Sequence, residues 1–164
     1  MAAKVAGCPT IIAVDPQLSR RELALELGAT HAVDPKHEDP VEAITRITEG
    51  GADYSVDCIG FPAVVQQALE CLKSPGICAS VGFQGADNEI TINQGHLLFG
   101  RSLVGVIEGD ADPDEFIPRM ISLYREGKFP FDRLLQVFPL AEINEAIDSA
   151  HHGKVTKAVV RFPA

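Results

Sequence analysis

The sequence has no tryptophan, no long apolar run and no cluster of basic residues. No stretch approaches the roughly 18 apolar residues that a membrane helix needs. The first ten residues hold a lysine but no apolar signal-peptide core, which argues against secretion. With 14 basic against 23 acidic side chains, the net charge is −9, and such a chain is a poor candidate for binding nucleic acid. These absences favour a cytoplasmic protein with neither a membrane nor a nucleic acid as partner.

The chain also lacks any metal-ligand spacing. Its four cysteines form no C-x-x-C pair, and we expect reduced thiols that pack as small apolar side chains. None of its five histidines has a partner four residues away or a cysteine in ligand spacing. The acidic run 109–115 (GDADPDE) lacks the full EF-hand pattern, so a loop that leads into a helix is the better interpretation. The sequence therefore predicts no metal site.

What the sequence does contain is a regular alternation of apolar strands and amphipathic helices, typical of a mainly parallel sheet with helices on both faces. Its 164 residues, 46% of them apolar, suffice for one ordinary domain, predicted to span residues 1–164. Strands are expected at residues 10–14, 31–33, 52–60, 77–81, 89–92, 102–107 and 155–162. Helices are expected at residues 2–7, 18–27, 40–48, 62–73, 93–99, 112–125 and 140–150.

In open parallel sheets, ligands bind at the carboxyl ends of the strands. Four strand ends qualify here, at Asp15, 58–60, 81–83 and 106–108, and glycines in two of them would let a flat ligand approach the backbone. An acid like Asp15 holds the adenosine ribose in dinucleotide-binding folds, about 20 residues after a glycine-rich phosphate loop. Counting back from Asp15 runs past the start of the chain.

Four blocks in order carry a family resemblance: AAKVAGC-x-x-IIAVD, LALELGATHAVD, VDCIG and GVIEGDADPDEFIPRMISLYREGKFPFDRL. Together they resemble the cofactor-binding half of the zinc-dependent, medium-chain alcohol dehydrogenases, over almost every residue. The last block, with the later AEINEAI, is most similar to the aryl-alcohol (benzyl-alcohol) dehydrogenases. The resemblance implies a Rossmann-like, doubly wound α/β fold and the NAD-binding portion of an enzyme that oxidises primary, aromatic alcohols to aldehydes.

The resemblance also implies what precedes this sequence in the family. The helix that ends near residue 7 would follow the glycine-rich loop, so the first strand, that loop and the catalytic domain with its zinc ligands would be absent. The chain alone is then expected to be inactive and to bind NAD weakly or not at all. The absent strand is central in the family, between the strands at 10–14 and 53–57. We expect those two strands to pair directly, or another segment or chain to lie between them, with residues 1–9 displaced.

The resemblance assigns roles to individual residues. Asp15 would accept hydrogen bonds from the adenosine ribose and repel a 2′-phosphate, which favours NAD over NADP; an acid that caps the next helix is the alternative. Arg20 would flank the ribose, and the pair Arg20-Arg21 leaves room for NADP. The other expected contacts are Cys58, Ile59 and Gly60 for adenine and its ribose, Val81, Gly82 and Phe83 for the nicotinamide ribose, Val106, Ile107 and Glu108 for the carboxamide, and Lys157 for the pyrophosphate. Most of these could equally be the ends of core strands.

Lys157 departs from the arginine usual in the family, and lysine cannot bind a phosphate bidentately. In the family, the segment that corresponds to residues 89–107 pairs across a twofold axis, so a homodimer is expected. Two other interpretations stay open: a non-catalytic module that folds or dimerises without cofactor, and a flavodoxin-like or receiver domain, against which the ordered blocks argue.

Overall fold

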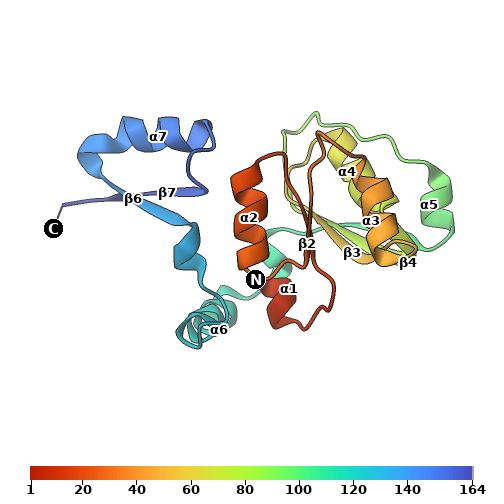
Figure 1. Ribbon diagram of the computed structural model, residues 1–164, viewed down its shortest axis with the longest axis horizontal. Helices are drawn as coiled ribbons and strands as arrows, with labels where there is room; N and C mark the ends of the chain where they lie inside the picture. Colours follow the sequence, from red (N-terminus) through yellow and green to blue (C-terminus); the bar gives the residue numbers. More distant parts are fainter. Residues whose placement is uncertain (164) are drawn as a thin grey trace. The chain divides into compact units, whose positions relative to one another are not determined.

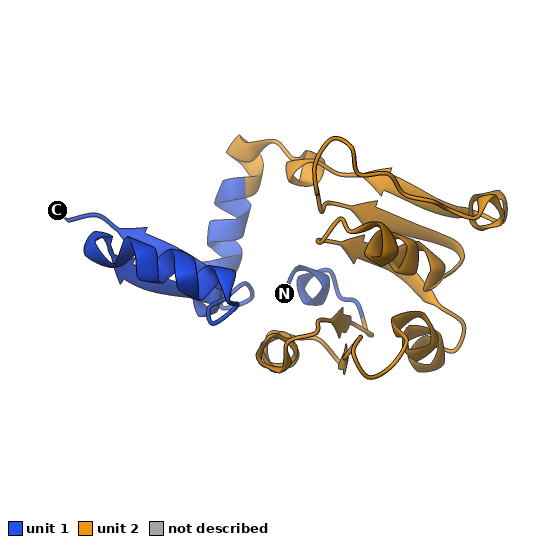
Figure 2. Cartoon of the chain, turned by 90° about the horizontal axis from the view of Figure 1, so that it is seen from above, with its two compact units in different colours: residues 1–8, 117–164 blue, residues 9–116 orange. Residues whose placement is uncertain are grey.

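A computed structural model describes residues 1–163. The chain divides into two compact units, coloured separately in Figure 2. The larger unit is Pro9–Phe116. The smaller unit combines Met1–Cys8 with the chain from Ile117 onward. No helix within the described residues is long and apolar enough to cross a membrane.

The larger unit is an α/β structure whose strands are all parallel. Its two ladders are β1-β2 and β3-β4-β5. The elements follow one another as β1 (Ile12–Val14), α2 (Leu18–Glu26), β2 (His31–Val33), α3 (Pro40–Thr48), β3 (Ala52–Asp57), α4 (Pro62–Glu70), β4 (Leu72–Ser80), α5 (Gln94–Leu98), β5 (Arg101–Gly105) and the 3-10 turn η1 (Glu108–Asp110). The alternation of helices with parallel strands confirms the predicted fold class.

Local sequence signals explain where α3 begins and ends. The carboxylate of Asp39 accepts a hydrogen bond from the amide of Glu42 at 3.0 Å, and Pro40 occupies the first turn, where no amide is needed. Glu49 ends the helix in the left-handed conformation. Helix α4 also starts with a proline and buries Val65 and Leu69. The core of this unit is the cluster of Leu69, Leu72 and Cys78 beneath α4.

The smaller unit contains a second parallel pair of strands with one helix over it (Figure 1). Its elements are α1 (Ala2–Val5), α6 (Pro113–Arg125), which begins in the larger unit, the 3-10 turns η2 (Phe131–Leu134) and η3 (Leu140–Glu142), β6 (Leu135–Pro139), α7 (Ile143–His151) and β7 (Lys157–Arg161). Phe138, Ala146 and Val155 form its core, one from β6, one from α7 and one from the turn before β7.

Three expectations about elements are corrected. Residues 89–92 form no strand; Ile92 packs against the core cluster around Leu69 while Ile90 is exposed, so the two isoleucines do not share one buried face as they would in a strand. Strand β6 was not predicted, since its five residues are fixed by pairing with β7, about twenty residues further along. Strand β4 also begins earlier than expected, at Leu72, and passes through Ser74-Pro75-Gly76.

Of the outcomes expected for the strands at 10–14 and 53–57, direct pairing and an inserted segment of this chain are both wrong, while a second chain between them stays a prediction. Within residues 1–163, β1 pairs only with β2, β3 pairs only with β4, and no other segment joins either ladder between them. Different helices hold the two ladders: α2 packs on β1 and β2, while α4 packs on β3 and β4.

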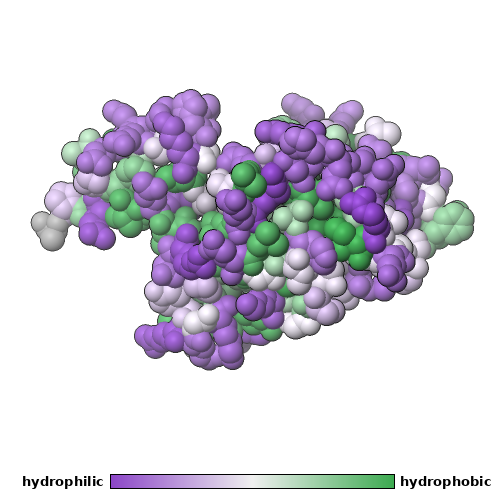
Figure 3. Space-filling model, in the orientation of Figure 1, coloured by the Kyte–Doolittle hydropathy of each residue, from purple (hydrophilic) through white to green (hydrophobic). Residues whose placement is uncertain are grey.

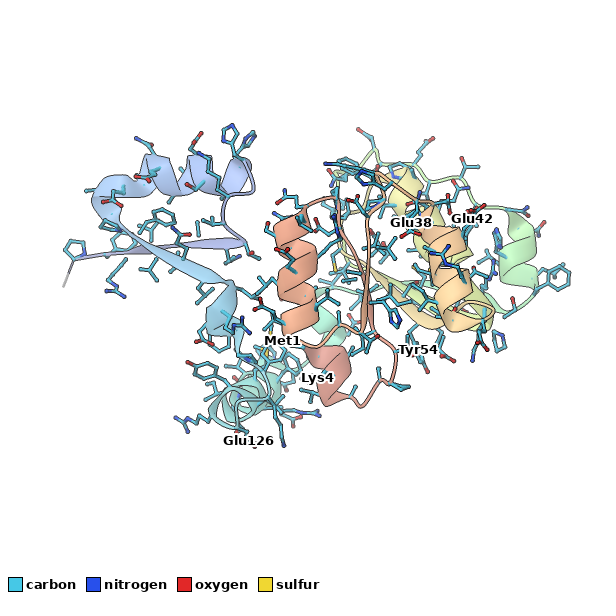
Figure 4. The ribbon with its side chains drawn as sticks, in the orientation of Figure 1. Met1, Lys4, Glu38, Glu42, Tyr54 and Glu126 are labelled. Atoms are coloured by element: carbon cyan, nitrogen blue, oxygen red, sulfur yellow. The ribbon has the colours of Figure 1, made fainter. Side chains whose placement is uncertain are left out.

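The face of β3 opposite α4 is correspondingly open. Tyr54 is 71% exposed and Val56 is 63% exposed, whereas the Ser55 hydroxyl between them donates to the carbonyl of Ala68 in α4. Figure 4 shows the Tyr54 side chain on the side of β3 away from α3. Strands of parallel sheets are normally covered on both faces, whereas β3 is covered on one.

Candidate functional site

The predicted residues of the larger unit lie directly after the strands, as expected. Asp15 follows β1, Cys58 to Gly60 follow β3, and Val81 to Phe83 follow β4. The ends of β3, β4 and β5 are joined by backbone hydrogen bonds: the amides of Val81 and Gly82 donate to the carbonyl of Asp57, and the amide of Val106 donates to the carbonyl of Ser80. The structure therefore brings three of the four strand ends together in one sheet.

Asp15 is not the cap of helix α2. Its Oδ1 accepts from the amide of Gln17 at 2.8 Å, which closes a turn ahead of the helix, and the residue at the helix N-cap, Gln17, has no side-chain cap. Its Oδ2 has one ion-pair partner, Arg20 Nη1, at 3.8 Å. This oxygen can therefore accept a hydrogen bond from a ligand hydroxyl. The ribose role of Asp15 and the flanking role of Arg20 stay predictions.

Arg21 organises this end of the unit, and its role was missed from the sequence. Its Nη1 donates to the carbonyl of Asp15 at 2.7 Å, and its Nη2 lies 2.7 Å from Asp34 Oδ2. Asp34 follows β2, so Arg21 ties the ends of β1 and β2 together. A hydrogen bond from the amide of Lys36 lowers the pKa of Asp34 against the opposing effect of burial, and His37 and Arg21 lower it further. No local motif signals this pairing.

Gly60 and Gly82 are needed where the turns after β3 and β4 touch. Gly60 has φ +82°, and a Cβ there would lie 2.6 Å from the carbonyl carbon of Gly82. A Cβ on Gly82 would lie only 2.2 Å from the amide nitrogen of Gly60. The sequence suggested that these glycines admit a flat ligand; the close approach of the two backbones is a sufficient reason for both.

Asp57 is a second residue that the sequence reasoning missed. Only 2% of it is exposed, and its carboxylate accepts from the amides of Ile59 at 3.0 Å and Gly60 at 3.0 Å. Its carbonyl accepts from Val81 and Gly82. One buried residue thus shapes both turns. Its sequence signal is that an acid ends the strand, directly before the turn at Gly60.

The segment after Phe83 is tied back onto the same turn by two amide side chains. Gln84 Nε2 donates to the carbonyl of Ile59 at 2.6 Å, and Asn88 Nδ2 donates to the carbonyl of Gly60 at 2.7 Å. Phe83 itself is 79% exposed. The turn after β3 is therefore held from one side by Asp57 and from the other by this segment.

The remaining predicted residues present a mainly apolar surface. Ile59, Val81 and Ile107 are all exposed, and Glu108 begins η1 with a positive φ of 50°. Cys58 is exposed as a residue, but its thiol is partly buried. This burial, together with the charge of Asp57, raises the pKa of the thiol, so it is neutral at pH 7. Exposed apolar side chains around strand ends suit a flat, aromatic ligand. Their contacts with adenine, nicotinamide ribose and carboxamide stay predictions.

Lys157 opens β7 in the smaller unit and is exposed, in register with Leu135 of β6. Its role toward a pyrophosphate stays a prediction. Within residues 1–163, no group of three or more His, Cys, Asp or Glu side chains could hold a metal ion. A catalytic zinc needs three protein ligands, so these residues do not fit one.

Parallel strands that alternate with helices, with an acid and close-packed glycine turns at their carboxyl ends, define the Rossmann-like class of nucleotide-binding folds. The model of the family described as zinc-binding dehydrogenase matches residues 1–126, and the chain belongs to this family. It corresponds to the C-terminal, cofactor-binding portion of medium-chain alcohol dehydrogenases.

The relatives are dehydrogenases longer than this chain. The chain is 41% identical over 164 residues to a geraniol dehydrogenase of Castellaniella defragrans, covering 99% of this chain and 44% of the relative. A zinc-binding-domain alcohol dehydrogenase from Burkholderia ambifaria superposes with a TM-score of 0.96 at 43% identity, over 99% of this chain and 44% of that one. A benzyl alcohol dehydrogenase from Acinetobacter calcoaceticus gives 0.96 at 39% identity, over 99% and 45%.

The chain thus spans less than half the length of the relatives that it matches. One further solved structure, a zinc-binding dehydrogenase from Sinorhizobium meliloti, contains bound NADP; it has 30% identity and a TM-score of 0.78 over 89% of this chain and 43% of that one. Members of this family therefore bind NAD or NADP. The similarity to a benzyl alcohol dehydrogenase agrees with the resemblance to aryl-alcohol enzymes.

Proposed function

We propose that this chain is the NAD-binding portion of an alcohol dehydrogenase that transfers hydride between a primary, aromatic alcohol and NAD. The observation that carries the proposal is the Asp15 carboxylate, whose Oδ2 has Arg20 at 3.8 Å as its ion-pair partner and can accept a ribose hydroxyl. Support for the substrate class comes from the 39% identity to a benzyl alcohol dehydrogenase. A geraniol dehydrogenase, at 41% identity, also acts on a primary alcohol.

The residues of this chain would bind and orient the cofactor. Asp15 would accept hydrogen bonds from the ribose and repel a 2′-phosphate by its negative charge. The apolar surface of Cys58, Ile59 and Gly60 would cover adenine, and Val81 to Phe83 would contact the nicotinamide ribose. Backbone groups of Val106 to Glu108 would orient the carboxamide. When bound, NAD accepts the hydride from the alcohol carbon.

Titration of NADH and NADPH into the 164-residue chain tests the proposal through the change in nicotinamide fluorescence. We expect weak binding with a preference for NADH. Equal affinity, or tighter binding of NADPH, would contradict the role of Asp15. No binding of either would support the alternative, a module without cofactor.

Zinc chemistry is not expected from these residues, because no cluster of three ligands exists among residues 1–163. We predict that the purified chain carries no stoichiometric zinc by elemental analysis and does not oxidise benzyl alcohol. One zinc per chain, or measurable turnover, would overturn this prediction.

A dimerisation role has its own support, from apolar side chains exposed on and near β5. Leu98 and Phe99 are 75% and 73% exposed at the end of α5, and Figure 3 shows hydrophobic atoms gathered there. Within the described residues, β5 is an edge strand, paired only with β4. We infer a homodimer through residues 89–107, as a self-complementary contact. Light scattering that finds only monomer at high concentration would refute it; open-ended aggregation would indicate an unprotected edge.

A further inference from the structure

Two basic and two acidic side chains gather at the ends of β1 and β2. They are Asp15 with Arg20 at 3.8 Å, and Arg21 with Asp34 at 2.7 Å. The two ion pairs differ in quality. The Arg21–Asp34 pair is short and mostly buried, with 13% and 17% of the side chains exposed. The Arg20–Asp15 pair is long, and the Nε of Arg20 is buried without a hydrogen-bond partner.

Asp34 is held in place to serve as the counter-ion of Arg21. Its Oδ1 accepts from the amide of Lys36 at 2.9 Å, and its Oδ2 lies 3.0 Å from His37 Nδ1. Arg21 reaches across to the carbonyl of Asp15, so its positive charge lies beside the residue that would face the ribose. Charges this close are well within the Debye length of about 8 Å at physiological ionic strength.

The balance of these charges decides whether a 2′-phosphate is tolerated. With Asp34 ionised, the two arginines are matched by two carboxylates, and Asp15 would be the group that receives a ribose hydroxyl. Without the charge of Asp34, the guanidinium of Arg21 would be unpaired, and a pair of arginines forms the usual recognition site for a phosphate.

We propose that Asp34 determines cofactor choice: by pairing with Arg21 it keeps this arginine from a 2′-phosphate, so that the carboxylate of Asp15 selects NAD over NADP. Asp34 is a positioning residue, since it acts through Arg21 and does not itself contact the cofactor. The inference rests on the proposed NAD-binding function.

The test compares Asp34→Asn and Asp34→Glu in the 164-residue chain. Dissociation constants are measured for NADH and NADPH by fluorescence, and for 5′-AMP and 2′,5′-ADP, which carry only the adenosine half, by NMR shift titration. Asp34→Asn keeps the size but removes the charge, and we expect the preference for the unphosphorylated ligand to fall by about five- to tenfold. Asp34→Glu keeps the charge and should retain the preference.

Two further variants isolate the mechanism. Glu38→Gln removes one negative charge from the same connection, but Glu38 pairs with Arg46 at 2.8 Å and lies by α3 in Figure 4, so the preference should not change. The double variant Arg21→Leu/Asp34→Asn removes the unpaired cation, and the preference should return to that of the unmutated chain.

Each outcome decides the question. The inference would be overturned if Asp34→Asn keeps the ligand preference or loses affinity equally for both ligands. It would also be overturned if the preference falls as much in Asp34→Glu or Glu38→Gln as in Asp34→Asn, or if it stays equally low in the double variant. In all these cases the proposed function would still stand. If the unmutated chain binds none of the four probes, the proposed function fails, and the inference falls with it.

Discussion

The strand ends after β1 and β2 are built differently from those after β3 and β4. At the first pair, charged side chains make the contacts: Arg21 joins Asp15 to Asp34, and Arg20 lies beside them. At the second pair, backbones meet at Gly60 and Gly82, and the buried carboxylate of Asp57 receives backbone amides. The first arrangement can change its charge without moving the chain, whereas the second fixes the path of the chain itself.

This difference separates residues that would determine ligand selectivity from residues that determine the path of the backbone. The Arg20–Asp15 pair is long and partly exposed, and such pairs contribute little to stability, roughly 0–1 kcal/mol, so substitution of Asp15 should alter ligand preference more than folding. A buried polar group that loses its partner costs about 1–3 kcal/mol, and an atom forced into a packed backbone costs about as much. Substitutions after β3 and β4 should therefore act first on stability.

The largest effect is expected for Gly82→Ala. Its Cβ would lie 2.2 Å from the amide nitrogen of Gly60 and 2.3 Å from the carbonyl carbon of Ile59, and no side-chain movement can relieve a clash with backbone. We expect a loss of about 3 kcal/mol in the free energy of unfolding, measured in urea. Gly105→Ala is the matched control at the end of β5, because nothing lies within 4 Å of its added Cβ. Equal losses in the two variants would contradict the importance of the contact.

The next largest effect is expected for Asp57→Asn. Asparagine keeps one acceptor but turns the other oxygen into an NH₂ group that faces the amides of Ile59 and Gly60, and we expect a cost of about 2 kcal/mol. Asp53→Asn is the control on the same strand: Asp53 is exposed and pairs with Lys73 at the surface, so its loss should cost less than about 1 kcal/mol. Equal shifts of the unfolding midpoint in the two variants would contradict the role of Asp57 in holding the two turns.

Local signals made much of the fold predictable. Helix α3 and strand β2 have the predicted bounds, because an N-cap acid with proline at the first turn, and a short apolar run between turns, act within a few residues. Strand β6 was not predicted, and the strand predicted at 89–92 does not form, because strand pairing depends on a distant partner. The expected direct pairing of β1 with β3 was wrong as well: among residues 1–163, β1 pairs only with β2 and β3 pairs only with β4, and the strand sequences alone do not determine which strands pair.

The site was predictable only where a residue follows a strand directly. Asp15, Gly60 and Gly82 lie at the predicted strand ends. Arg21 and Asp57 were missed, since their importance comes from partners that only the fold brings close: Asp34 for the first, and the turn after β4 for the second. An acid at the end of a buried strand is the one general signal that could have found Asp57.

On the charged side, Asp15→Ala should narrow the preference for NADH over NADPH by about tenfold, because a hydrogen bond to a charged group contributes roughly 1.5–3 kcal/mol and about 1.4 kcal/mol is tenfold in affinity. The free energy of unfolding should fall by no more than about 1 kcal/mol, since only the hydrogen bond from the amide of Gln17 and the long ion pair with Arg20 are lost. Parallel titrations with NADH and NADPH measure the change in preference, and unfolding in urea measures the change in stability. If Asp15→Ala loses stability but keeps its preference for NADH, the strand ends after β1 and β2 act on folding rather than on ligand selectivity, contrary to the comparison.

The smallest effect is expected for the side chains that tie the segment after β4 to the turn after β3. Asn88→Ala removes the hydrogen bond from Asn88 Nδ2 to the carbonyl of Gly60 at 2.7 Å, which is partly buried, and should cost about 1 kcal/mol. Gln84→Ala removes the exposed bond to the carbonyl of Ile59 and should cost less. The segment between these residues forms no helix or strand, so the loss should be local. Hydrogen exchange should quicken for amides between Gly85 and Asn93 while those of β3 keep their rates. Faster exchange throughout β3 and β4 would mean that the segment between Gln84 and Asn88 supports the sheet. The turns after β3 and β4 would then not depend on Asp57, Gly60 and Gly82 alone.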